Sequence, residues 1–201
     1  TGVHVLNCLF RSITSSTSDG GAIYCTSVTY FLVESTSFFT CKTSSNQGGA
    51  IFFQNSNGQC VLHEVCGYDC YSTYTSRSYY QFAYILVNNA ISSKNYMNYS
   101  SIVRCVNLRT DSYYTLRLSC GKICCPSVNI SMNKCQWYSG IYCLPYSDSN
   151  SFICSLSYSS FAYNIANGHT CIRFTNNNAK YEIKSCNILR NTQVSSSEGT
   201  I

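Results

Sequence analysis

The chain has 201 residues, of which 45% are hydrophobic, 10% are charged and 15 are Cys, and its formal net charge is +5. This composition excludes an intrinsically disordered tail, and a content of only 11 glycines excludes collagen. No apolar run approaches the roughly 18 residues of a membrane-spanning helix, and no window clusters Lys and Arg as a nucleic-acid-binding patch does. We therefore expect no transmembrane segment and no nucleic-acid partner. The start at Thr1 indicates a processed or partial chain.

The first 53 residues contain a clear internal repeat. Residues 19–24 read Asp-Gly-Gly-Ala-Ile-Tyr and recur at 47–52 as Gln-Gly-Gly-Ala-Ile-Phe. Upstream of them, residues 7–10 and 35–38 are separated by the same shift of 28 residues, so an entire unit is repeated. The paired glycines indicate a tight corner that needs unusual backbone angles.

Most units begin and end with a short segment in which apolar residues alternate, the pattern of a half-buried strand. The apolar positions of the first strand are Val3/Val5, Phe31/Val33, Val61/His63, Cys154/Leu156 and Tyr181/Ile183. Those of the closing strand are Ile23/Cys25, Ile51/Phe53, Ala83/Ile85, Leu116/Leu118, Ile141/Cys143 and Ile172/Phe174. Sustained helical periodicity does not occur.

A small residue follows the first strand of each unit at intervals of about 30 residues. The predicted column of small residues is Cys8, Thr36, Cys66, Cys105, Cys135, Ser159 and Cys186. Its longest interval includes the polar, Asn-rich residues 87–100, which we interpret as an insertion loop.

Short strands, polar turns and a regular period predict an all-β fold, a parallel β-solenoid of about seven coils. We expect one solenoid domain over residues 1–192 and a flexible tail over 193–201. The alternative is a β-sandwich, which also has many short strands. In-phase cysteines favour the solenoid, because they mark positions that stack from coil to coil.

These segments resemble the GGAI and FxxN repeats of chlamydial polymorphic outer-membrane proteins and of β-helix surface proteins of trichomonads. The matching residues are Gly20-Gly21-Ala22-Ile23, Gly48-Gly49-Ala50-Ile51, Phe161-x-x-Asn164 and, with Ile for Phe, Ile188-x-x-Asn191. Phe10 and Phe38 match the Phe, but Ile13 and Cys41 stand where the Asn would be. The resemblance is specific over residues 1–53, moderate over 151–192 and poor between them.

The resemblance implies a pectin-lyase-like right-handed β-helix with an adhesin or surface-coat role, extracellular or at the cell surface. Two other roles stay open: a carbohydrate-active enzyme on the same fold, and an intracellular cytoskeletal scaffold. We expect no enzyme, because the eight acidic residues do not form a convincing catalytic group. Glu34 and Glu64 share a phase in adjacent coils, and their charges would repel each other there.

A zinc site is the sharpest alternative chemistry. Cys60, His63, Cys66 and Cys70 have the ligand types and close spacing of such sites. Alternation along a strand, however, points Cys60 and His63 to opposite faces. We therefore interpret His63 as an inward core residue equivalent to Val5 and Val33, and we expect no metal and no cofactor.

The outward positions of the closing strands form the candidate contact surface. They read Tyr24, Phe52, Tyr84, Arg117, Tyr142 and Arg173 down successive coils. An exposed stripe of this kind could stack on sugar rings or bind a partner protein. It could equally stiffen the sheet by pairing aromatic residues across strands.

Fifteen cysteines in a chain of low charge favour an oxidising compartment with disulfides between adjacent coils. They could instead be reduced core residues, which would favour the intracellular scaffold. Sequons at Asn98 and Asn129 add faint support for a secreted glycoprotein. Because uncapped solenoid ends expose strand edges, we also expect end-to-end or lateral assembly with other subunits, or a longer solenoid.

Overall fold

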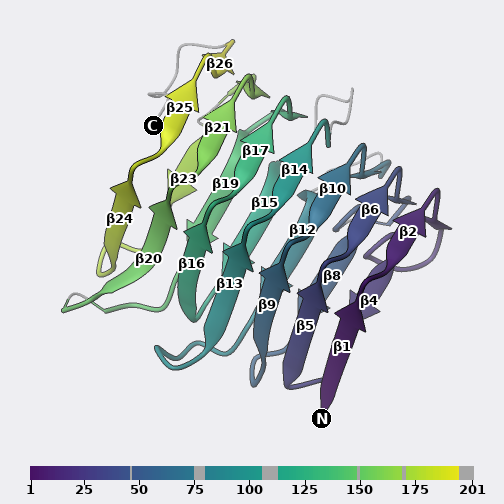
Figure 1. Ribbon diagram of the computed structural model, residues 1–201, viewed down its shortest axis with the longest axis horizontal. Helices are drawn as coiled ribbons and strands as arrows, with labels where there is room; N and C mark the ends of the chain where they lie inside the picture. Colours follow the sequence, from purple (N-terminus) through teal and green to yellow (C-terminus); the bar gives the residue numbers. More distant parts are fainter. Residues whose placement is uncertain (46, 75–79, 106–112, 149, 169–170, 195–201) are drawn as a thin grey trace.

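The computed structural model describes residues 1–45, 47–74, 80–105, 113–148, 150–168 and 171–194, and β-strands are the regular structure within them. Successive turns of the chain stack on one another in sequence order, from β1 at one end to β24 and β25 at the other (Figure 1). Neighbouring strands come from successive repeats and run parallel. The predicted all-β parallel solenoid is confirmed, and the β-sandwich is excluded.

Three long sheets and two short ones form the sides of the solenoid. The first sheet contains β1 (Gly2–Leu6), β5 (Tyr30–Glu34), β9 (Gln59–His63), β13 (Lys94–Asn98), β16 (Lys122–Pro126), β20 (Phe152–Ser157) and β24 (Lys180–Lys184). The second contains β2 (Leu9–Arg11), β6 (Ser37–Phe39), β10 (Cys66–Tyr68), β14 (Ser101–Val103), β17 (Asn129–Ser131), β21 (Ser160–Ala162) and β25 (Asn187–Leu189).

The third sheet closes each turn. It contains β4 (Ile23–Cys25), β8 (Ile51–Gln54), β12 (Tyr80–Leu86), β15 (Tyr114–Ser119), β19 (Tyr138–Leu144) and β23 (Ile172–Phe174). The two short sheets contain β3 (Thr14–Ser15), β7 (Lys42–Thr43) and β11 (Tyr71–Ser72), and β18 (Lys134–Cys135), β22 (Ile165–Ala166) and β26 (Thr192–Gln193). The first and second sheets have seven strands and the third has six, so the described chain makes six complete turns and starts a seventh.

Non-glycine residues in the left-handed backbone region form two corners of each turn. The corner between the first and second sheets has φ between 46° and 56° at Asn7, Ser35, Glu64, Tyr99, Ser127, Tyr158 and Ser185. The corner after the second sheet has φ between 51° and 58° at Ser12, Thr40, Asp69, Arg104, Met132, Tyr163 and Arg190. At the start of the third sheet, Gly20 and Gly48 have φ near +68° (69° and 67°), which confirms the predicted glycine corner.

The interior is filled by columns of side chains that stack from coil to coil. One column carries the Phe of the FxxN repeat and continues as Phe10, Phe38, Gly67, Ile102, Ile130, Phe161 and Ile188. The rings of Phe10 and Phe38 are parallel, with centroids 5.0 Å apart. At Gly67 the column has no side chain, because the Phe82 ring occupies that space: a Cβ on Gly67 would lie 2.3 Å from it.

Three residues further along, from the second coil onward, lies a second column, buried except at its half-buried last member, which we call the Cys/Asn ladder. Its members are Cys41, Cys70, Cys105, Asn133, Asn164 and Asn191. In coils with Asn, the amide oxygen accepts the backbone N–H of the preceding coil, as Asn164 does from Asn133 at 3.0 Å. Its amide nitrogen donates to the carbonyl of the Phe column, as Asn164 does to Ile130 at 2.8 Å.

Cysteine takes over the role of Asn in this ladder. The Cys70 thiol donates to the Phe38 carbonyl at 3.4 Å and accepts the backbone N–H of Cys41. The Cys41 thiol donates to Phe10 and accepts from Ile13 in the same way. These coils therefore keep the interaction pattern of FxxN although their sequence lacks the Asn. The hydrogen bond with the Cys105 thiol, together with burial, raises the pKa of Cys70.

The predicted column of small residues is correct at four positions and wrong at three. Cys8, Thr36, Ser159 and Cys186 are in register at the first corner, where their side chains donate to the carbonyl two residues before them. The other members of that column are Val65, Ser100 and Val128. Cys66 is one residue further on and faces outward, Cys105 lies in the Cys/Asn ladder, and Cys135 lies in the short strand β18.

Two further expectations need correction. In the third coil, Cys60 and Leu62 point inward, and Val61 and His63 point outward, because β9 pairs Cys60 with Phe31 and Leu62 with Val33. Residues 87–100 are not simply an insertion loop, since they include strand β13 of the first sheet.

Of the predicted tail, residues 195–201 lie outside the described part of the chain. Among the described residues we find no helix with the length and hydropathy that a membrane crossing needs.

Candidate functional site

The six outward residues of the third sheet form one continuous column, which we call the outer stack. Strand pairing places Tyr24 beside Phe52, Phe52 beside Tyr84, and Tyr84 beside Arg117. Arg117 then lies beside Tyr142, and Tyr142 beside Arg173. The predicted register of this column is therefore correct over all six coils.

The outer stack is less exposed than its outward phase suggests. Tyr24 at its end is 54% exposed, but Phe52 and Tyr84 are only 4% and 7% exposed. The rings of Tyr24 and Phe52 stack with centroids 5.2 Å apart, and those of Phe52 and Tyr84 with centroids 5.3 Å apart. The stiffening role is thus present at Phe52 and Tyr84, and the prediction that they are exposed is wrong.

The two arginines of the outer stack lie over aromatic rings of the same molecule. The Arg117 guanidinium is 5.6 Å from the ring centroid of Tyr84 and 5.1 Å from that of Tyr142. It also donates to the Ser119 hydroxyl at 2.8 Å. The Arg173 guanidinium lies 5.3 Å from the Tyr138 ring. All three guanidinium-to-ring distances fall within the range of cation–π attraction, so each charge is held in place on the sheet.

Two tyrosines that the sequence pattern did not identify enlarge this surface. Tyr114 and Tyr138 stack with centroids 5.1 Å apart, and Tyr114 lies 4.8 Å from Tyr142. Strict alternation from Leu116 would turn Tyr114 inward, but the pairing of β15 with β19 is irregular at this point. Burial raises the pKa of Tyr114 to about 12, with a further contribution from Tyr142. The result is a packed layer of aromatic rings and guanidinium groups.

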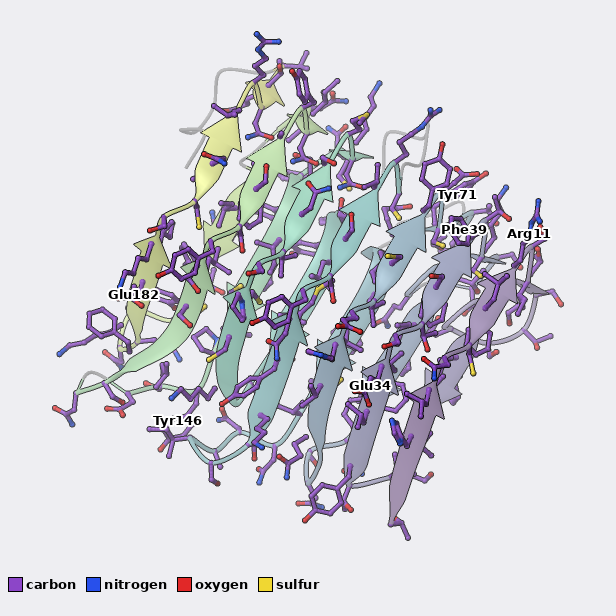
Figure 2. The ribbon with its side chains drawn as sticks, in the orientation of Figure 1. Arg11, Glu34, Phe39, Tyr71, Tyr146 and Glu182 are labelled. Atoms are coloured by element: carbon purple, nitrogen blue, oxygen red, sulfur yellow. The ribbon has the colours of Figure 1, made fainter. Side chains whose placement is uncertain are left out.

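The candidate catalytic carboxylates are not in the same phase. Glu34 pairs in register with His63, and its carboxylate lies 3.1 Å from His4. Glu64 is at the corner residue that follows, where it accepts from the Ser35 hydroxyl at 2.7 Å. Figure 2 shows Glu34 and Glu182 at distant places along the first sheet, on its second and last strands. Glu34 and Glu64 are therefore offset by one residue, and the predicted shared phase is wrong.

The residues of the zinc alternative point in different directions. Cys60 and Cys70 are buried in the interior, whereas Cys66 is exposed on the outside of the second sheet. His63 faces outward, packs edge-on against Tyr99 and lies 3.8 Å from Glu64. Its interpretation as an inward core residue is wrong. Within the described ranges, no group of three or more His, Cys, Asp or Glu side chains could hold a metal ion.

All fifteen cysteines are thiols in the structure, nine of them buried. The disulfides favoured from the sequence are therefore not part of it.

Of the two sequons, Asn129 is exposed on the second sheet, where its amide donates to Ser101. Asn98 ends strand β13, and the hydroxyl of its sequon, on Ser100, is buried and accepts from the Val65 N–H. The loop expected at Asn98 is thus a strand end.

Comparison with known proteins identifies one repeat. Residues 7–26 match the Chlamydia polymorphic membrane protein repeat, a segment that includes Phe10 and Gly20-Gly21-Ala22-Ile23. No curated protein and no solved structure matches the chain. The match covers 20 of the 201 residues. The matched segment and the parallel solenoid around it are similar to a β-helix of the chlamydial polymorphic membrane protein type.

Proposed function

We propose that this chain is a non-catalytic structural or adhesive β-solenoid, displayed extracellularly or at the cell surface, that binds partner proteins or glycans. The observation that carries the proposal is the surface-protein repeat at residues 7–26, whose geometry continues through the later coils. A solenoid of this kind holds many side chains at fixed intervals of about 4.8 Å, which suits recognition of extended ligands.

The outer stack is the contact surface of this proposal. Its exposed end is Tyr24, and Arg117, Tyr142 and Arg173 are half-buried, so rings and charges are both accessible. Cation–π contacts with neighbouring tyrosines fix the positions of the two guanidinium groups, which lowers the entropy lost when a ligand binds. Assembly with other subunits, end to end or side to side, is a second mode of contact, since any strand edge that lacks a neighbour can pair with a strand of another chain.

A glycan array, combined with lyase and hydrolase assays on the array hits, tests this proposal. We expect binding without cleavage, and weaker binding by Tyr24→Ser and Arg173→Gln. Tyr30→Ser is the matched control, because Tyr30 is 59% exposed but belongs to the first sheet. Cleavage of a bound polysaccharide would replace the proposal with the carbohydrate-active enzyme. Equal losses in Tyr30→Ser would show that the outer stack is not the contact surface.

The free thiols favour a second candidate, an intracellular cytoskeletal scaffold subunit, because reduced cysteines persist in the reducing cytosol. Titration of thiols in denatured protein taken directly from its source cells distinguishes the two. Fifteen free thiols would support the scaffold, whereas paired cysteines would support display outside the cell.

A further inference from the structure

A shallow groove lies on the outside of the second sheet, away from the outer stack. Leu9, Arg11, Ser12, Phe39, Thr40 and Tyr68 line it, and its volume is about 420 Å³. This volume is within the range of about 300–1,000 Å³ that small-molecule sites occupy. The groove exists because β2, β6 and β10 alternate strictly: Phe10, Phe38 and Gly67 point inward, so their neighbours point outward.

The floor of the groove is aromatic. Phe39 and Tyr68 are in register on adjacent strands, and each is 37% exposed. Their ring centroids are 6.2 Å apart and the rings are tilted by 45° to each other. Two neighbouring rings that remain open to solvent on a rigid sheet offer flat apolar surface, which binds well to the faces of sugar rings.

An arginine stands at each end of this aromatic pair. Arg11 is in register with Phe39 on the neighbouring strand, and Figure 2 shows both side chains on this side of the molecule. The Arg104 guanidinium lies 5.8 Å from the Tyr68 ring centroid, in the coil beyond. Between Arg11 and Arg104 the chain rises by three coils, or about 14 Å at about 4.8 Å per coil.

Neither arginine is neutralised within the described part of the chain, where the ion pairs are His4 with Glu34 and His63 with Glu64. The nearby carboxylate of Asp69 is at the same corner as Thr40, and it acts on the Lys42 ammonium. Within the described residues no ion pair joins Asp69 to Arg11 or Arg104, and Lys42 is a third cation near them, so the positive charges of this region outnumber the one carboxylate. Ser12 and Thr40 add two hydroxyl groups, which lie 3.0 Å from each other.

We infer that this groove binds an acidic saccharide whose carboxylates are on non-adjacent rings. Each guanidinium binds one carboxylate through bidentate hydrogen bonds. The uncharged sugar ring between the two acidic rings stacks on Phe39 and Tyr68. The hydroxyls of Ser12 and Thr40 are available for the sugar hydroxyls.

An acidic peptide fits this groove less well than a saccharide does. The backbone groups of β6 are bonded to β2 and β10 on its two sides, so the sheet face offers only side chains. A peptide would have to leave most of its own N–H and C=O groups unpaired over this face, or bind at a strand edge instead. A saccharide has its charge and its hydroxyls on the rings themselves and needs only the side chains that the groove provides.

Isothermal titration calorimetry with the full chain and a hyaluronan hexasaccharide, whose carboxylates alternate with uncharged rings, tests the inference. We expect saturable binding that weakens as salt is raised from 20 to roughly 150 mM, because the Debye length falls to about 8 Å. The double variant Arg11→Gln/Arg104→Gln and the single variant Phe39→Ser should each bind at least tenfold more weakly. Circular dichroism should show that both variants remain folded, since these side chains lie on the surface.

Arg190→Gln is the matched control. Arg190 lies over Tyr163 at 5.6 Å at the same type of corner, but far along the second sheet from the groove. Its affinity for the hexasaccharide should stay within twofold of the parent chain. Tyr30→Ser should also leave binding unchanged, because Tyr30 is exposed on the first sheet and belongs neither to this groove nor to the outer stack.

Four results would overturn the inference. They are the absence of binding, an equal loss of affinity in Arg190→Gln, equal binding of a neutral hexasaccharide, and equal binding of a glutamate-rich peptide that depends on the same residues. A sulfated hexasaccharide is the remaining arm. The sulfated hexasaccharide is compared on the parent chain and on the Arg11→Gln/Arg104→Gln variant. If the variant still binds the sulfated saccharide but no longer binds hyaluronan, the sulfated saccharide binds elsewhere, and recognition of carboxylates in the groove is supported.

Discussion

The Cys/Asn ladder predicts a large effect of a single buried side chain. Asn164 is fully buried, accepts the Asn133 N–H at 3.0 Å and donates to the Ile130 carbonyl at 2.8 Å. Replacing it by Ala leaves both backbone groups without these partners in the interior. A buried polar group that loses its partner costs about 1–3 kcal/mol, so the two together cost about 2–6 kcal/mol. The side chains of Asn133 and Asn191 lose a contact as well.

Asn164→Cys provides the sharper comparison. Cys41 and Cys70 show that a thiol in this ladder both accepts the backbone N–H and donates to the carbonyl. We therefore expect Asn164→Cys to recover at least half of the stability that Asn164→Ala loses. Asn129→Ala is the surface control, since the exposed Asn129 amide bonds only a hydroxyl across the sheet, and its effect should be within about 0.5 kcal/mol.

Urea unfolding followed by circular dichroism measures these changes as the free energy of unfolding. Hydrogen exchange of the Asn133 amide adds a local readout, because solenoids do not always unfold in one cooperative step. If Asn164→Ala costs less than about 1 kcal/mol, or if Asn164→Cys is no better than Asn164→Ala, the account of the ladder as a set of required hydrogen bonds is refuted.

The other predictions concern packing, pH and thiol reactivity. Gly67→Ile should destabilise the fold by several kcal/mol by clashing with Phe82, whereas combining it with Phe82→Ala should restore stability; additive losses in a double-mutant cycle would contradict this. Burial raises the pKa of Cys171 to about 12, so this thiol contributes stability that is fully present below its unfolded pKa, near 9, and is lost as pH rises above that value. Under reducing conditions, unfolding free energy should thus fall between pH 8 and roughly 10, and less steeply in Cys171→Ala; a flat profile would refute it. With a thiol reagent, native protein should be labelled first at the exposed Cys8 and Cys66, and the nine buried cysteines should react only on unfolding, as mass spectrometry of the labelled peptides can verify.

The repeat period made the fold predictable from the sequence. The shift of 28 residues between Gly20-Gly21 and Gly48-Gly49 marks equivalent positions on adjacent coils, and the structure stacks them as adjacent corners. The register of the outer stack followed from the same logic, because Tyr24 and Arg173 belong to strands whose apolar phase is unambiguous. A column could therefore be predicted from the sequence wherever only one of the two alternating sets of residues in a strand is apolar.

The third coil shows where this reasoning fails. Either alternating set of residues in this strand could be buried from the sequence alone, since Cys60, Val61 and Leu62 are apolar and His63 can be buried or exposed. Pairing of β9 with Phe31 and Val33 decides that Cys60 and Leu62 are inside. A shift by one residue turns every side chain of a strand over, and only the neighbouring strand removes that ambiguity.

The sequence by itself determined that this protein is a parallel solenoid, because a repeated pattern of short strands can bury its apolar residues only by stacking. Tertiary structure alone decided which side chains share a column. It showed that Cys41 and Cys70 replace Asn, because a buried backbone N–H and C=O need a hydrogen-bond partner, which a thiol or an amide can provide. It also decided that Phe52 and Tyr84 are covered by neighbouring rings, while Phe39 and Tyr68 remain open beside two arginines. Burial depends on what packs beside a residue, and residues adjacent in space are here a whole coil apart in the chain.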